Sequence, residues 1–161
     1  GWKDHVSNLE TAYNAFHGCE SLQNLNGLSD WNMPSITNMR EMFKGCHTLT
    51  NISALATWDV SGVENMEGMF GDCRSLSNIS PLSDWEFPNV TDMRGMFAGG
   101  WQTQDDQSTQ GPLSSLTNLG PLASWNVVSV TNMAGMFGYS AITNVNGFKT
   151  LFSMNKILYN L

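Results

Sequence analysis

The sequence repeats with a period of 27 residues, and this period constrains the fold more than any single residue does. The interval separates aligned columns of cysteine, tryptophan and phenylalanine: Cys19, Cys46 and Cys73; Trp31, Trp58 and Trp85; and Phe16, Phe43, Phe70 and Phe97. Trp125 and Phe137 rejoin these columns after 40 residues, because 13 extra residues are inserted near Trp101. Such a unit cannot bury its own apolar face and must stack on a neighbour, which is typical of solenoids. We therefore expect function on a surface rather than in a cleft.

One segment of each unit has the apolar spacing of a short helix. Positions i, i+3 and i+7 are apolar in four units: Ile36, Met39 and Phe43; Val63, Met66 and Phe70; Val90, Met93 and Phe97; and Val130, Met133 and Phe137. This spacing predicts one buried stripe of a helix. Pro34 and Pro88 stand just before the stripe, where proline suits a helix start. Gly18 and Gly45 follow the phenylalanines, where a glycine with positive φ is expected to close the helix.

The next segment recurs as Leu-x-Asn-apolar and predicts brief strands or extended turns. It occupies positions 22–25, 49–52, 76–79, 116–119 and, with Ile in place of Leu, 142–145. Stacked in register, these segments would form a parallel sheet along one side of the coil. Their amides are expected to hold buried turn backbone by hydrogen bonds in one unbroken column: Asn24, Asn51, Asn78, Asn118 and Asn144. A second polar column, interpreted in the same way, consists of Asn38, Asn65, Asp92 and Asn132.

The cysteine and tryptophan columns are interpreted as parts of the core. In-register strands lie about 4.8 Å apart, whereas a disulfide needs Cβ atoms about 3.8 Å apart and turned toward each other. Cys19, Cys46 and Cys73 are therefore predicted to be free, buried thiols. The tryptophan rings are expected to pack between units, and an exposed row of rings that holds sugar or peptide is the alternative.

Composition excludes several kinds of partner. Seven basic and 14 acidic residues give a net charge of -7, which repels nucleic acid and anionic lipid surfaces. No apolar run approaches the roughly 20 residues needed to cross a bilayer, so no direct membrane insertion is expected. The chain begins at Gly1 without Met or a signal segment, and we interpret it as a piece of a longer protein.

The residues offer no catalytic or metal-binding pattern. His5, His17 and His47 occupy different columns, and neither His-x-x-x-His nor Cys-x-x-Cys occurs. We therefore expect no metal site and no cofactor. Serine, histidine and aspartate are scattered through the repeats rather than gathered in a nucleophile elbow, so we expect no enzyme activity.

The repeat resembles that of a known family. Residues 58–76 read Trp-Asp-Val-Ser-Gly-Val-Glu-Asn-Met-Glu-Gly-Met-Phe-Gly-Asp-Cys-Arg-Ser-Leu, and residues 130–137 read Val-Thr-Asn-Met-Ala-Gly-Met-Phe. Both are similar to the repeat of BspA-like leucine-rich-repeat surface proteins, also described as the mycoplasma-type lipoprotein repeat or domain of unknown function 285. The resemblance extends from Asp4 to about Phe148. It departs where Asp4 replaces the first Trp, where Leu113 or Ser140 stands near the cysteine column, and at 100–112, which has no counterpart.

Together the period and the resemblance predict an α/β solenoid, a leucine-rich-repeat-like right-handed coil. It would contain about five 27-residue rungs, each with a short strand or extended turn and a short helix. The solenoid is expected to cover residues 1–148, with an insertion loop at 100–112. Residues 149–161 are expected to be a C-terminal cap or a degenerate rung.

The insertion contributes the first candidate binding residues. An exposed Trp101 could stack on a sugar ring while Gln104, Asp105 and Asp106 hydrogen-bond its hydroxyls, and the paired carboxylates could instead hold Ca²⁺. The alternative is a solvated loop, because Gly, Gln, Ser and Thr offer little apolar surface to bury.

Columns whose occupants vary between units contribute the other candidates. The position after Trp holds His5, Asn32, Asp59, Glu86 and Asn126. The expected helix exterior holds Tyr13, Arg40, Glu67, Arg94 and Ala134. A row that lines the concave face of a solenoid becomes its natural contact strip.

These observations, with the resemblance, predict an extracellular recognition or adhesion module of a bacterial-type surface protein, attached to a cell or secreted. Its partner would be a protein, matrix or glycan ligand on a host or neighbouring cell. The alternatives are a structural spacer that projects another domain and an accessory region of a surface glycan-active enzyme.

Overall fold

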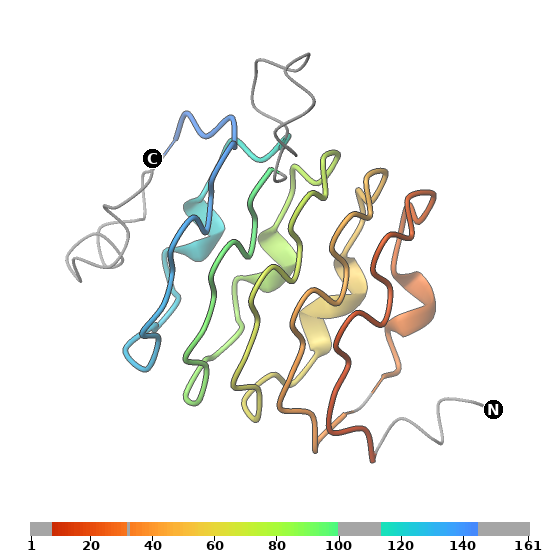
Figure 1. Cartoon of the computed structure of the whole chain (residues 1–161), viewed down its shortest axis with the longest axis vertical. Helices are drawn as coiled ribbons and strands as arrows, with labels where there is room; N and C mark the ends of the chain where they lie inside the picture. The colour runs from red at the N-terminus through yellow and green to blue at the C-terminus, as the bar shows by residue number, and fades with distance from the viewer. Residues whose placement is uncertain (1–7, 32, 100–113, 145–161) are drawn as a thin grey trace, which may run out of the picture.

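The computed structural model describes residues 8–31, 33–99 and 114–144 of the chain. Successive repeat units lie side by side as a row of coils (Figure 1), and residues 27 apart in sequence are neighbours in space. The expected insertion loop at 100–112 and the expected cap at 149–161 both lie outside the described residues.

A short 3₁₀ helix follows each of the first four Leu-x-Asn-apolar segments. These helices are η2 (Asn26–Leu28), η3 (Ser53–Thr57), η4 (Ser80–Leu82) and η5 (Gly120–Leu122), and they lie along one side of the row (Figure 1). Local chemistry explains their position. The Oδ1 atoms of Asn51 and Asn78 accept the backbone N–H groups of Ser53 and Ser80 at 2.9 and 3.0 Å, which starts the helix.

The helix expected over 36–43 is absent, and the segment is a series of turns. Its backbone N–H groups donate to the next unit rather than along a helix: Met39 to Asn65 O, Glu41 to Glu67 O and Phe43 to Met69 O, at 2.8–2.9 Å. Glu41 also has a φ of +53°, which no right-handed helix contains. A backbone made of turns thus buries the side chains at i, i+3 and i+7 as well as a helix would. Gly18 and Gly45 have the expected positive φ, at turns instead of helix ends.

Parallel pairing between units occurs as single bridges, and the described residues form no longer strand. One column of bridges joins Thr11, Asn38, Asn65, Asp92 and Asn132, and a second joins Asn24 to Asn51 and Asn118 to Asn144. Two polar columns predicted to hold the turns therefore occupy the pairing positions. The first asparagine column is exposed, contrary to the burial expected for it, because its amides bond the turn from the solvent side.

The core is built from the repeated apolar columns. Phe43, Phe70 and Phe97 stack with centroids 5.6 Å apart. Trp31, Trp58, Trp85 and Trp125 are buried, which confirms the packing interpretation of this column. The indole N–H groups of three of them donate to a carbonyl of the preceding unit: Trp58 to Leu28 O, Trp85 to Leu55 O and Trp125 to Leu82 O, at 3.1, 2.9 and 2.8 Å.

All three cysteines are free, as predicted, but only two are buried. The thiols of Cys46 and Cys73 donate to Phe16 O and Phe43 O at 3.2 Å, whereas Cys19 is exposed. Cys19 belongs to the first described unit, in which several core columns are less enclosed than in the middle of the stack.

We expect this difference to appear in thiol labelling. Burial raises the pKa of the Cys46 thiol to about 11, and that of Cys73 is raised well above its ordinary value for the same reason. A thiol reagent at pH 8 should therefore modify Cys19 rapidly and the other two only after denaturation. Cys19→Ser should abolish the rapid phase. Rapid labelling of a second thiol in the native protein would contradict the core arrangement.

The same shift gives a direction for the pH dependence of stability. A thiol whose pKa is raised in the folded state contributes its full stabilisation to the fold below its unfolded pKa of 9.0. This stabilisation is lost as the pH rises toward about 11. Denaturation should therefore become easier across this alkaline range.

Candidate ligand-binding groove

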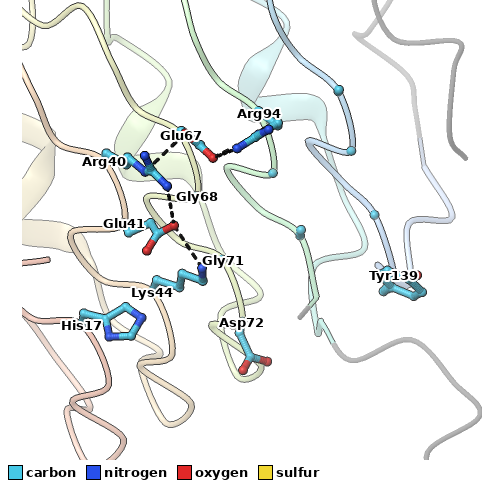
Figure 2. A pocket seen from close by; sticks show the side chains of 15 residues that line it. His17, Arg40, Glu41, Lys44, Glu67, Gly68, Gly71, Asp72, Arg94 and Tyr139 are labelled. Carbon is cyan, nitrogen blue, oxygen red and sulfur yellow. Dashed lines mark hydrogen bonds and ion pairs between the residues drawn. The ribbon is translucent and has the colours of Figure 1, made fainter. Parts of the chain in front are cut away.

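A hollow of about 1050 Å³ crosses five units on the face formed by the turn segments (Figure 2). We call it the groove, and it is lined by His17, Arg40, Glu41, Lys44, Glu67, Gly68, Gly71, Asp72, Arg94, Gly95, Ala98, Ala134, Gly135, Gly138 and Tyr139. His17 and Tyr139 lie at opposite ends of the view. The groove therefore runs along the stack rather than into any single unit.

The polar bridge column positions the long side chains of the groove. The Oδ1 atoms of Asn38, Asn65 and Asp92 each accept the backbone N–H group two residues ahead, at 2.8–2.9 Å, and these groups belong to Arg40, Glu67 and Arg94. The residue that follows each of the three has a positive φ of 53–60°. The same local geometry thus recurs in three units and presents one variable side chain in each.

The charged side chains form an alternating row that we call the ion-pair ladder: Lys44, Glu41, Arg40, Glu67 and Arg94. Lys44 Nζ lies 3.1 Å from Glu41 Oε1, Arg40 Nη2 lies 3.5 Å from the same oxygen, and Arg40 Nε lies 3.3 Å from Glu67 Oε2. Glu67 Oε1 accepts from Arg94 Nε at 3.0 Å (Figure 2). The ladder joins three consecutive units through their side chains.

Proton affinities in the ladder follow from this pairing. Burial raises the pKa of Glu41, but the hydrogen bonds and charges of Lys44 and Arg40 outweigh it and hold that pKa below its usual value. The carboxylate of Glu67 raises the pKa of Arg94. Glu41 and Arg94 are therefore charged at neutral pH, and the lining carries three cations (Arg40, Lys44, Arg94) against three carboxylates (Glu41, Glu67, Asp72). Asp72 is paired outside the ladder, with His47 and Arg74 at 2.9 and 2.8 Å.

The other end of the groove is made of small residues and one aromatic ring. Its lining there consists of Gly95, Ala98, Ala134, Gly135, Gly138 and Tyr139. Tyr139 is 62 % exposed and has a φ of +57°. A Cβ added at Gly135 would meet nothing within 4 Å, so the space above this floor is open.

The structure separates the two variable rows proposed as contact strips. Asp59, Glu86 and Asn126 are exposed but do not line the groove. Asp59 and Asn126 instead bond their own turns, to the N–H groups of Ser61 and Val128 at 2.9 and 3.3 Å, and the Ser61 hydrogen bonds lower the pKa of Asp59. The remaining candidates, Trp101, Gln104, Asp105, Asp106 and Asn32, lie outside the described residues.

The second row does line the groove, through Arg40, Glu67, Arg94 and Ala134. Sequence reasoning missed Glu41, Lys44 and Tyr139. For Glu41 and Tyr139 the signal was a departure from the repeat column: Glu41 replaces the glycine found at Gly68 and Gly95, and Tyr139 replaces the glycine found at Gly18 and Gly45.

Neither a metal centre nor a membrane span is found among the described residues. Within ranges 8–31, 33–99 and 114–144, no three His, Cys, Asp or Glu side chains are placed to hold a metal ion. No helix in those ranges has the length and apolar content to cross a bilayer.

Stacked repeat units with a variable charged row define this chain as a repeat protein. The model of one protein family, described as "Mycoplasma protein of unknown function, DUF285", matches residues 8–146 and 101–158. The chain belongs to this family, which confirms the resemblance to domain of unknown function 285. No curated protein and no solved structure matches the chain.

Proposed function

We propose that this chain is a recognition segment of an extracellular surface protein and that the groove is its ligand-binding face. The units would continue as a leucine-rich-repeat-like solenoid of the BspA-like kind. Parallel bridges between residues 27 apart support this architecture, as do backbone hydrogen bonds that run from unit to unit. The ligand would be a protein or glycan on a host or neighbouring cell.

The observation that carries the proposal is the contrast between constant and variable columns. The bridge and core columns keep the same residue types in successive units. The column whose side chains line the groove instead changes from Arg40 to Glu67 to Arg94 to Ala134. A constant scaffold with a variable exposed row is the arrangement by which repeat proteins recognise extended ligands. The groove has room for such a ligand at about 1050 Å³.

A structural spacer is the second candidate, and one observation favours it. Every member of the ion-pair ladder has a partner within the ladder, so these charges also strengthen contacts between units. A spacer needs such contacts and no ligand.

Filling the groove separates the two candidates. Ala134 is exposed in the groove lining, and Ala123 is exposed outside it. In binding to glycan and matrix-protein arrays, Ala134→Trp should weaken the strongest interaction by about tenfold, equivalent to about 1.4 kcal/mol. Ala123→Trp should leave it unchanged. Equal binding by both variants would place the ligand elsewhere, and absence of binding by well-folded protein would favour the spacer.

A further inference from the structure

Tyr139 is held in a conformation that its residue type disfavours. Its φ of +57° suits glycine, and the same column holds Gly18 and Gly45 with positive φ and the smaller Asp72 with a φ of +57° in the earlier units. A tyrosine there accepts both backbone strain and a side chain that is 62 % exposed. Strain of this kind at an exposed side chain points to a functional constraint.

The surroundings of Tyr139 leave room for a flat group beside its ring. Gly135, Gly138, Ala98 and Ala134 line the same end of the groove, and a Cβ on Gly135 would meet open space. An aromatic ring next to an unobstructed floor can stack against the apolar face of a ring-shaped ligand.

The rest of the groove favours a ligand without net charge. Its three cations and three carboxylates balance, and each of the six has an ionic partner within 3.5 Å. An ionic ligand would have to displace one of these partners. Hydroxyl groups both donate and accept hydrogen bonds, so they can bond carboxylate oxygens and guanidinium or ammonium hydrogens without breaking the pairs.

Peptide addition as an extra strand is disfavoured by the backbone beneath the groove. The N–H groups of Glu41, Gly68 and Gly95 already donate to Glu67 O, Arg94 O and Ala134 O at 2.8–3.0 Å. No open row of backbone donors is therefore presented at these positions for an added strand.

We propose that the groove binds a neutral oligosaccharide, with one sugar ring stacked on Tyr139 and the hydroxyls of adjoining sugars bonded to the ion-pair ladder. This inference rests on the proposed recognition function and specifies its ligand class.

The test uses the whole chain with short linear oligosaccharides of glucose, galactose, mannose and N-acetylglucosamine, and with polyglutamate and polylysine as charged probes. The variants are Tyr139→Gly, Tyr139→Phe and, as an exposed apolar control outside the groove, Val128→Ala. Tyr139→Gly removes the ring and also relieves the positive φ, so its thermal midpoint should be unchanged or higher. Calorimetric titration measures affinity, and a thermal melt checks the fold.

We expect at least one neutral oligosaccharide to bind, with an affinity that changes little with added salt because no net charge is neutralised. Tyr139→Gly should weaken that binding by about tenfold or more, and Tyr139→Phe and Val128→Ala by less than about threefold. Failure of every oligosaccharide to bind, or equal binding by Tyr139→Gly, overturns the inference. If Ala134→Trp abolishes binding of a charged peptide instead, the groove is a recognition site and only the sugar assignment is wrong.

Discussion

Phe70→Ala is expected to lower the free energy of unfolding by about 3–5 kcal/mol, the range for truncating a buried phenylalanine. Phe70 is buried in the middle of the phenylalanine column, with ring centroids 5.6 Å from those of both Phe43 and Phe97. The cavity would therefore weaken contacts on two sides at once. Because each unit contacts only its neighbours, such a loss in a central unit affects the cooperativity of the whole stack.

Chemical denaturation followed by circular dichroism measures this effect. Phe70→Leu keeps most of the apolar volume and should cost less than the alanine variant. Val128→Ala, at a position that is 62 % exposed, should change stability by no more than about 0.5 kcal/mol. If Phe70→Ala costs less than about 1 kcal/mol, the rings are not packed as a continuous column.

Gly99→Ala is the second large expected effect, and it acts through the backbone. A Cβ at position 99 would lie 2.3 Å from Tyr139 O and 3.0 Å from Ser114 N. Neither atom can rotate away as a side chain can, so the backbone of two later segments must shift. Gly99 N–H also donates to Gly138 O at 2.7 Å, and the same shift would strain that bond. We expect a cost of about 1–3 kcal/mol or more, the range for overpacking a core.

A glycine with free space provides the matched control. A Cβ on Gly27 would meet nothing within 4 Å, so Gly27→Ala should be close to neutral in the same unfolding measurement. Because Gly99 approaches the backbone of Tyr139, Gly99→Ala should also weaken ligand binding, whereas Gly27→Ala should not. Equal stabilities for the two alanine variants would show that the units on either side of the insertion do not pack this closely.

Several features of the fold follow from the repeat itself. Equal spacing of Phe43, Phe70 and Phe97 predicted their contact, because residues one period apart must be neighbours if units stack. The positive φ at Gly18 and Gly45 followed from residue type. The helix over 36–43 did not form, because apolar spacing specifies which side chains are buried and leaves open which path the backbone takes between them. The α/β solenoid as a class stays a prediction.

The groove was only partly predictable, since it depends on which variable column faces the same side as its neighbours. Arg40, Glu67 and Arg94 were recognised as a variable row, but the row containing Asp59 had equal standing in the sequence. The two rows also differ in their hydrogen bonds. Asp59 uses its own carboxylate to hold its turn, whereas Asn38 holds the turn for Arg40, whose guanidinium pairs with Glu41 and Glu67. The distances between side chains of different units cannot be read from an alignment of the repeats.

The indole hydrogen bonds give an array of these units a chemical direction. In Trp58, Trp85 and Trp125 the buried donor belongs to the later unit and its acceptor carbonyl to the earlier one. Removing an earlier unit would leave an indole N–H group at the new end of the stack without its protein acceptor, and removing a later unit would leave a carbonyl there without its protein donor. The two ends of a shortened array therefore differ chemically, because one end presents indole donors and the other presents carbonyl acceptors.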